Sequence, residues 1–245
     1  KVLRFALNTF TKQLALGHDV PSESLSYLKV NRGYSEETII QWELGYAPDA
    51  WDTLKQPLID KGYFKEGEHI GLIKSTEEGK NYDFFRKRIM FPIRDARGIL
   101  RGFGGRVLDD SKPKYLNSSE SDFYSKSSIL YGLHLASNAI RKAKKAYMVE
   151  GYTDVISMHQ AGLSNTIATC GTSLTEDHIK LLKRYTNHVV ILRDGDAAGK
   201  KAAERDLKML LKAGMRSEIC ILPENEDPDT ICRRFSKPIP TNDRN

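Results

Sequence analysis

Acidic side chains that could bind a metal ion occur in three separate clusters of the sequence. Each cluster follows a short apolar run, and the members are Glu150 and Asp154, then Asp194 and Asp196, then Glu226, Asp227 and Asp229. Carboxylate oxygens are the ligands that Mg²⁺ and Mn²⁺ prefer, whereas zinc prefers nitrogen and sulfur. Two unit charges about 4 Å apart repel by about 4 kcal/mol at an effective dielectric near 20, so gathered acids stay ionised only around a cation.

Strands and helices that could position these acids alternate along the last 100 residues. The pattern predicts strands at 146–150, 166–170, 188–193 and 218–222 and helices at 152–161, 176–185 and 197–213. Such alternation is typical of βαβ units and of a parallel sheet covered on both faces. Because ligands collect at the carboxyl ends of such strands, Glu150, Asp194 and Asp229 should lie close together. Any single acid could instead cap a helix, as Asp196 could for the helix from Ala197.

A basic stretch precedes the acidic clusters. Residues 81–126 contain ten basic and six acidic side chains, which gives +4 of the net charge of +6. Strand-like runs at 88–93 and 100–108 flank a turn, and alternation places Arg88 and Arg94 on one face with apolar residues opposite. That face either binds nucleic-acid phosphates or is a solvated sheet edge protected by charge, and the two interpretations are about equally supported.

Composition narrows the class of protein. The chain has 245 residues, 40% hydrophobic and 29% charged, as expected for one or two globular domains, and residues 1–75 are expected to form a helical scaffold. No apolar run approaches the roughly 20 residues that a membrane span needs, so we expect no membrane partner. Cys170, Cys220 and Cys232 are typical of reduced core residues, and the absence of a CxxC pair or a histidine cluster predicts no zinc site.

Several motifs in one order resemble the catalytic core of bacterial DnaG-type DNA primases. The acidic clusters are similar to the three acidic motifs of a Toprim domain. Segments 86–95, 102–108 and 113–118 of the basic stretch, and 130–133 after it, match further motifs of the family. The resemblance runs from about Leu7 to Phe235. It implies a mixed α/β fold: an α+β subdomain with a basic face over residues 1–145, a Toprim-type parallel-sheet α/β subdomain over 146–235, and a loose tail over 236–245.

The resemblance also implies an activity. These primases join ribonucleoside triphosphates into a short RNA primer on a single-stranded DNA template, using two or more Mg²⁺ or Mn²⁺ ions. It implies catalytic roles for Glu150, Asp194 and Asp196, which bind metal together with Asp154, Asp227 and Asp229. The side chains implied to bind nucleic acid or nucleotide are Arg86, Arg88, Arg94, Arg106, Lys114, Asn117 and Lys126. The replicative helicase would bind only through a region absent from this chain, in the cytoplasm at the replication fork.

The chain departs from the family pattern at a few positions, and other functions remain open. Arg193 stands where the family often has an aromatic residue, and Ala197 where it often has a basic one. No carboxylate is lost, so we expect an intact metal site. The alternatives are another Toprim metal enzyme, a nuclease or a topoisomerase fragment, and a non-catalytic single-stranded DNA-binding module. Such a module would tolerate Asp194→Ala and Asp196→Ala without loss of function.

Overall fold

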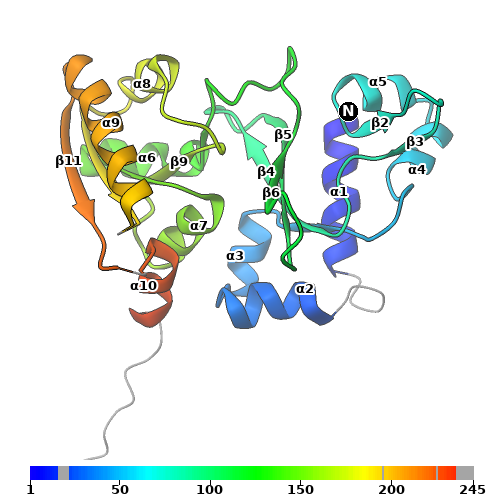
Figure 1. Cartoon of the computed structure of the whole chain (residues 1–245), viewed down its shortest axis with the longest axis horizontal. Helices are drawn as coiled ribbons and strands as arrows, with labels where there is room; N and C mark the ends of the chain where they lie inside the picture. The colour runs from blue at the N-terminus through cyan, green and yellow to red at the C-terminus, as the bar shows by residue number, and fades with distance from the viewer. Residues whose placement is uncertain (16–21, 195, 225, 236–245) are drawn as a thin grey trace, which may run out of the picture.

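The described residues form three sheets: a four-stranded and a two-stranded antiparallel sheet, and a five-stranded, mostly parallel sheet (Figure 1). The computed structural model describes residues 1–15, 22–194, 196–224 and 226–235. Antiparallel sheets with helices form the N-terminal part, and a mostly parallel five-stranded sheet forms the C-terminal part. The predicted mixed α/β fold is therefore confirmed. The predicted loose tail over 236–245 lies outside the described residues.

Short helices and strands build the first third of the chain. The helices are α1 (Val2–Ala15), α2 (Ser22–Ser26), the π-helix η1 (Tyr27–Asn31), α3 (Glu36–Gln41), α4 (Lys55–Asp60) and α5 (Phe64–His69). The short strands are β1 (Gly45–Ala47), β2 (Ile73–Ser75) and β3 (Asn81–Asp83). Ser35 begins α3, because its Oγ accepts a hydrogen bond from the Thr38 amide over 3.1 Å. Helix α1 lies against β1, where a Cβ on Gly45 would come within 2.7 Å of the Phe10 backbone.

A long hairpin forms the centre of the four-stranded antiparallel sheet. Its strands are β4 (Arg88–Arg94) and β5 (Leu100–Val107), and the sheet order is β1-β4-β5-β6 with β6 at Tyr115–Asn117. The hairpin is as predicted, but the exposed basic face is not. Strand β4 is covered on both sides: Arg88 is buried and donates to the carbonyls of Gly105 and Pro113, and Arg94 Nε donates to Glu43 over 3.0 Å. The alternation of residue types was right, but packing on both faces turned these charges inward.

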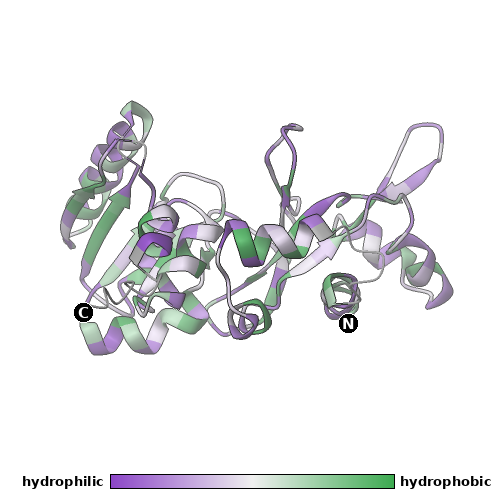
Figure 2. Ribbon diagram, turned by 90° about the horizontal axis from the view of Figure 1, so that it is seen from below, coloured by the Kyte–Doolittle hydropathy of each residue, from purple (hydrophilic) through white to green (hydrophobic). Residues whose placement is uncertain are grey.

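The second sheet has the order β11-β10-β8-β9-β7, in which only the edge strand β7 is antiparallel. Its strands are β7 (Leu130–Tyr131), β8 (Ala146–Val149), β9 (Thr166–Thr169), β10 (His188–Arg193) and β11 (Arg216–Ile221). The helices are α6 (Leu133–Ala143), α7 (Tyr152–Gln160), α8 (Glu176–Leu182), α9 (Ala197–Lys212) and α10 (Pro228–Phe235). Figure 2 shows apolar residues gathered in the strands and mixed with polar ones along the covering helices. Because β7 joins this sheet, the sheet itself begins before the boundary predicted at residue 146.

Helix α8 is capped by Thr175, whose Oγ1 accepts a hydrogen bond from the His178 amide. One prediction in this part needs correction, because not all three cysteines lie in the core. Cys220 is exposed, because β11 is the outer strand of the sheet, whereas Cys170 and Cys232 are buried as expected. On α9, Leu211 is exposed, whereas Asp206 is buried and paired with Arg193 and Arg205. No helix within the described ranges combines the length and the apolar character needed to cross a bilayer.

Aromatic rings join the two sheets. The ring of Tyr152, at the start of α7, stacks on Phe91 of β4 with centroids 5.5 Å apart and lies 4.6 Å from the ring of Tyr131 in β7. Tyr131 in turn stacks on Trp42 at 5.4 Å. Tyr152 fits because Gly104 of β5 faces it without a side chain: a Cβ at that position would overlap the ring. These rings fix the seam along which the candidate site lies.

We therefore expect Gly104→Ala to destabilise the fold by about 1–3 kcal/mol, because an added methyl group overpacks the seam. Thermal and urea unfolding would measure the loss. The double variant Gly104→Ala/Tyr152→Leu removes the ring that the methyl group meets, so its two changes should cost less together than the sum of the single changes. Strict additivity in this cycle would contradict the proposed clash.

Candidate active site

A cavity of about 360 Å³ lies where the two sheets meet. Four of the six predicted metal-binding acids line it: Glu150, Asp154, Asp194 and Asp227. The opposite wall comes from the N-terminal part of the chain and includes Arg32, Lys114 and Asn117. Acidic side chains thus face basic and amide side chains across one hollow. The roles assigned to these residues from sequence stay predictions, but their placement supports them.

The parallel sheet explains why the acids meet. Glu150 directly follows β8 and Asp194 directly follows β10, and the two strands are hydrogen-bonded neighbours in parallel register. Asp227 follows β11, the next strand outward, through a short connection. The carboxyl ends of all three strands therefore open on the same edge, as the sequence predicted. Asp154 reaches the cavity from the first turn of α7, which begins two residues after Glu150.

Asp194 has the environment of a cation ligand. Its Oδ1 is buried and has no hydrogen-bond partner among the described residues. Burial, and then repulsion by Glu150, Asp227 and Asp196, raises the pKa of Asp194 to about 6, although the neighbouring Arg193 acts in the opposite direction. A buried carboxylate without a partner is costly unless a cation relieves it. A divalent cation would do so.

Asp154 shows the same electrostatic stress. Its Oδ2 accepts a hydrogen bond from the Gly151 amide over 2.9 Å, yet burial raises the pKa of Asp154 to about 7. Repulsion by Asp227, Asp194 and Asp229 adds to that rise. Two carboxyl groups of one cavity thus hold their protons unusually tightly. Below neutral pH, uptake of a dication by this cavity would therefore release protons from these two carboxyl groups.

Two of the acids also cap helices. Asp196 Oδ1 accepts from the Gly199 amide over 2.6 Å at the start of α9, and Asp227 Oδ1 accepts from the Thr230 amide over 2.6 Å at the start of α10. The alternative interpretation of Asp196 as an N-cap is thus correct for that oxygen, and the side chain is exposed and outside the cavity lining. Across the described residues, no group of three or more His, Cys, Asp or Glu side chains is arranged to hold a metal ion.

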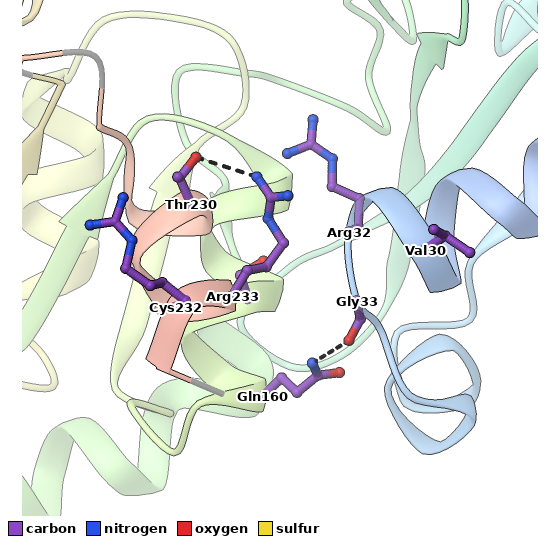
Figure 3. A pocket seen from close by; sticks show the side chains of 9 residues that line it. Val30, Arg32, Gly33, Gln160, Thr230, Cys232 and Arg233 are labelled. Carbon is purple, nitrogen blue, oxygen red and sulfur yellow. Dashed lines mark hydrogen bonds between the residues drawn. The ribbon is translucent and has the colours of Figure 1, made fainter. Parts of the chain in front are cut away.

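Asp229 lies behind the cavity and not in its wall. It is fully buried, forms an ion pair with Arg32 and another with Arg233 Nε at 3.2 Å, and accepts a hydrogen bond from Ser157. Figure 3 shows Arg32 and Arg233 approaching from the N-terminal part and from α10 around a second cavity. In this arrangement Asp229 connects α10 and α7 to the end of η1. Its predicted role as a metal ligand stays a prediction.

The predicted nucleic-acid-binding residues are spread over a wider area. Lys114 and Asn117 line the cavity, whereas the Arg106 guanidinium lies 4.6 Å from the centre of the Tyr27 ring. Arg86 lies 3.7 Å above the exposed Trp51 ring. The remaining three lie outside the cavity lining: Arg88, Arg94 and Lys126. Their predicted contacts with nucleic acid stay predictions.

Sequence reasoning missed two charged residues of the site. Arg32 lies in the helical region that was taken for scaffold, yet it lines the cavity and pairs with Asp229, 197 positions away. No local signal could have identified it. Arg193 was noted only as a departure from the family pattern, but its Nη1 lies 3.3 Å from Glu150 Oε1. A charged residue at the end of an otherwise apolar buried strand was the available signal.

Two family models match the chain. The N-terminal domain of the DNA primase catalytic core matches residues 10–137, and a Toprim-like model matches residues 147–232. The DNA primase of Escherichia coli K12 is 41% identical over 244 residues, covering 94% of this chain and 40% of its own length. That of Deinococcus radiodurans is 45% identical over 231 residues, covering 93% and 39%. The chain therefore spans about two fifths of the length of these relatives.

Solved structures of primase domains are also similar to this chain. The Escherichia coli primase catalytic core has a TM-score of 0.87 and 38% identity, covering 96% of this chain and 76% of that one. A DnaG primase catalytic domain bound to single-stranded DNA has a TM-score of 0.85 and 38% identity, covering 95% and 76%. The RNA polymerase domain of Mycobacterium tuberculosis primase DnaG, with double-stranded DNA carrying a 6-nucleotide overhang, scores 0.84 at 31% identity, covering 96% and 75%.

These matches agree with the geometry of the site. A Toprim domain implies a divalent metal, and the all-oxygen donor set and the unpartnered Asp194 oxygen fit one. The N-terminal model covers more than half of the chain, and the Toprim-like model covers most of the rest. The chain belongs to the DnaG primase catalytic-core family, with a Toprim domain as its second part.

Proposed function

We propose that this chain is a primase catalytic core that makes short RNA primers on single-stranded DNA from ribonucleoside triphosphates during DNA replication. The observation that carries the proposal is the shared cavity, in which acids from three strand ends face Lys114 and Asn117. Support comes from relatives whose catalytic domains were solved with single-stranded DNA and with overhanging double-stranded DNA. Binding of the replicative helicase and a place at the cytoplasmic replication fork stay predictions.

Primer synthesis joins the 3′ oxygen of one nucleotide to the α-phosphorus of the next and releases pyrophosphate. Bound Mg²⁺ or Mn²⁺, as two or more ions, would neutralise the phosphate oxygens and ease loss of the hydroxyl proton. Asp194, Asp154 and Asp227 would hold such ions, with Glu150 as a further ligand or as the base that takes the proton, and Asp196 would add its second carboxylate oxygen. The protein's main contribution is to position these groups.

The wall opposite the acids suits the triphosphate. Lys114 and Arg32 both line this wall and give it positive charge, although the Arg32 guanidinium is itself paired with Asp229. Asn117 is held rigidly, because its Oδ1 accepts from the Tyr152 hydroxyl over 2.8 Å and its Nδ2 donates to the Cys170 carbonyl over 2.9 Å. Positive charge on one wall and metal-binding acids on the other would hold a polyphosphate between them.

The template would run over the N-terminal part of the chain. The Arg86 guanidinium lies beside the exposed Trp51 ring and the Tyr82 ring, 3.7 Å and 5.1 Å from their centres. An arginine beside an accessible aromatic face can hold a phosphate while a base stacks on the ring, without reading sequence. Arg106 and Lys126 complete the proposed basic set, whereas the inward-turned Arg88 and Arg94 would support the sheet beneath it. Affinity for DNA should fall steeply with salt.

We expect Asp194→Asn to lower primer synthesis by about 100-fold or more, because it removes the charge that binds the cation. The assay follows oligoribonucleotide formation by the purified chain on single-stranded DNA with Mg²⁺ or Mn²⁺. The matched control is Asp110→Asn, on an exposed loop outside the cavity, which should retain the original rate.

Two results would contradict the proposed function. One is activity of Asp194→Asn within threefold of the original chain. The other is metal-dependent nicking of DNA with no RNA product, even when the acids are intact, which would favour a Toprim nuclease.

Cation affinity should depend on pH. The pKa of Asp194 is raised to about 6 and that of Asp154 to about 7, so protons compete with the metal below neutrality. We expect Mn²⁺ affinity, measured by calorimetry without nucleotide, to rise by about tenfold or more between pH 5.5 and pH 7.5. Asp154→Asn should flatten this dependence. An affinity that stays constant over that range would show that these carboxylates do not bind the ion.

A further inference from the structure

Arg193 is a buried cation at the edge of the acidic cavity. It is the last residue of β10, and only 7% of its side chain is exposed. Its Nη1 lies 3.3 Å from Glu150 Oε1, and its Nη2 forms an ion pair with Asp206 of α9. A guanidinium thus stands beside the strand end that carries Asp194, within reach of one of the acids.

Asp206 holds this guanidinium in place. Its side chain is fully buried inside the second part of the chain. While one oxygen pairs with Arg193, the other accepts from Arg205 Nη2 over 2.9 Å and from Arg205 Nε over 3.2 Å. Arg205 is half exposed and is not among the residues that line the cavity, whereas Arg193 bridges from Asp206 to Glu150. Because planar guanidinium groups pair with two partners at once, the bridge has a defined geometry.

We propose that Arg193 is a positioning residue that holds Glu150 against the sheet and weakens its contribution to cation binding. The inference rests on the proposed function only in taking the cavity as a divalent-cation site. The fixed positive charge of Arg193 competes with an incoming dication for Glu150, and it also repels the dication. Asp194, Asp154 and Asp227 would then be the main ligands of the cation. Glu150 would separate from Arg193 only when it acts as a further ligand or as a base.

A purely structural ion pair is the simpler interpretation. Buried pairs often serve packing alone, and breaking one leaves an uncompensated charge. That interpretation predicts that removing Arg193 lowers stability and leaves cation affinity unchanged or reduced. The proposed role predicts the opposite sign for affinity, so a binding measurement separates the two.

The experiment titrates Mn²⁺ into the purified chain and follows the free ion by electron paramagnetic resonance, without nucleotide or DNA. We expect Arg193→Gln to bind Mn²⁺ about tenfold more tightly, the size that Coulomb's law gives for removing a unit charge several ångströms from a dication in a partly solvated site. Arg193→Lys, which keeps the charge, should stay within about threefold of the original chain. Arg205→Gln is the matched control, because it loses a partner of Asp206 that does not reach Glu150.

A second variant keeps the test valid if Arg193→Gln folds poorly. Arg193→Gln/Asp206→Asn removes both charges of the buried pair, so no unpaired buried carboxylate remains. Its gain in affinity should have the same sign but be smaller, because the more distant negative charge of Asp206 is lost as well. Unchanged or weaker Mn²⁺ binding by this double variant, in a chain that unfolds cooperatively, would overturn the role of Arg193. Failure of the original chain to bind Mn²⁺ at all would instead contradict the proposed function, and the two failures are thus distinguishable.

Discussion

Mutual repulsion of carboxylates is the constraint on which the rest of this structure depends. Parallel strands deliver Glu150, Asp194 and Asp227 to one sheet edge, and folding gives them no freedom to separate widely. Each acid is relieved in its own way. Asp227 accepts a backbone hydrogen bond, Glu150 pairs with Arg193, and Asp194 and Asp154 hold protons more tightly than usual. Because these contacts only partly offset the repulsion among the carboxylates, the cavity still favours binding of a cation.

The aromatic seam between the antiparallel and the mostly parallel sheet supports this cavity. Tyr152 packs against Phe91 and Tyr131, fits over Gly104, and uses its hydroxyl to hold Asn117. The same residue therefore contributes to the core of the fold and to one wall of the cavity. Rigid support of this kind keeps opposing walls at a fixed separation, which a reaction that depends on alignment requires. Stability and function are coupled here through one side chain.

The sequence predicted those features that depend on periodicity within one element. The parallel sheet, its strand-end acids and the long hairpin could be predicted, because apolar runs separated by polar turn residues mark them in the local sequence. The prediction from sequence failed where tertiary packing determines whether a side chain is buried. The inward turn of Arg88, the burial of Asp206 on α9 and the place of Arg32 in the cavity depend on partners distant in the sequence. Strand alternation cannot reveal whether a second layer covers the polar face of a strand.

The ion pairs of Asp229 connect the last described helix of the chain to a residue near its start. Arg32 follows η1 near the start, whereas Asp229 and Arg233 belong to the final helix α10. A protein shortened to end before Pro228 would thus lose more than one helix. Arg32 would be left without its acidic counterpart, and the cavity would lose an anchored wall on its N-terminal side. A segment that keeps this cavity intact must therefore include both Arg32 and Asp229. Neither half of the chain alone would form the cavity.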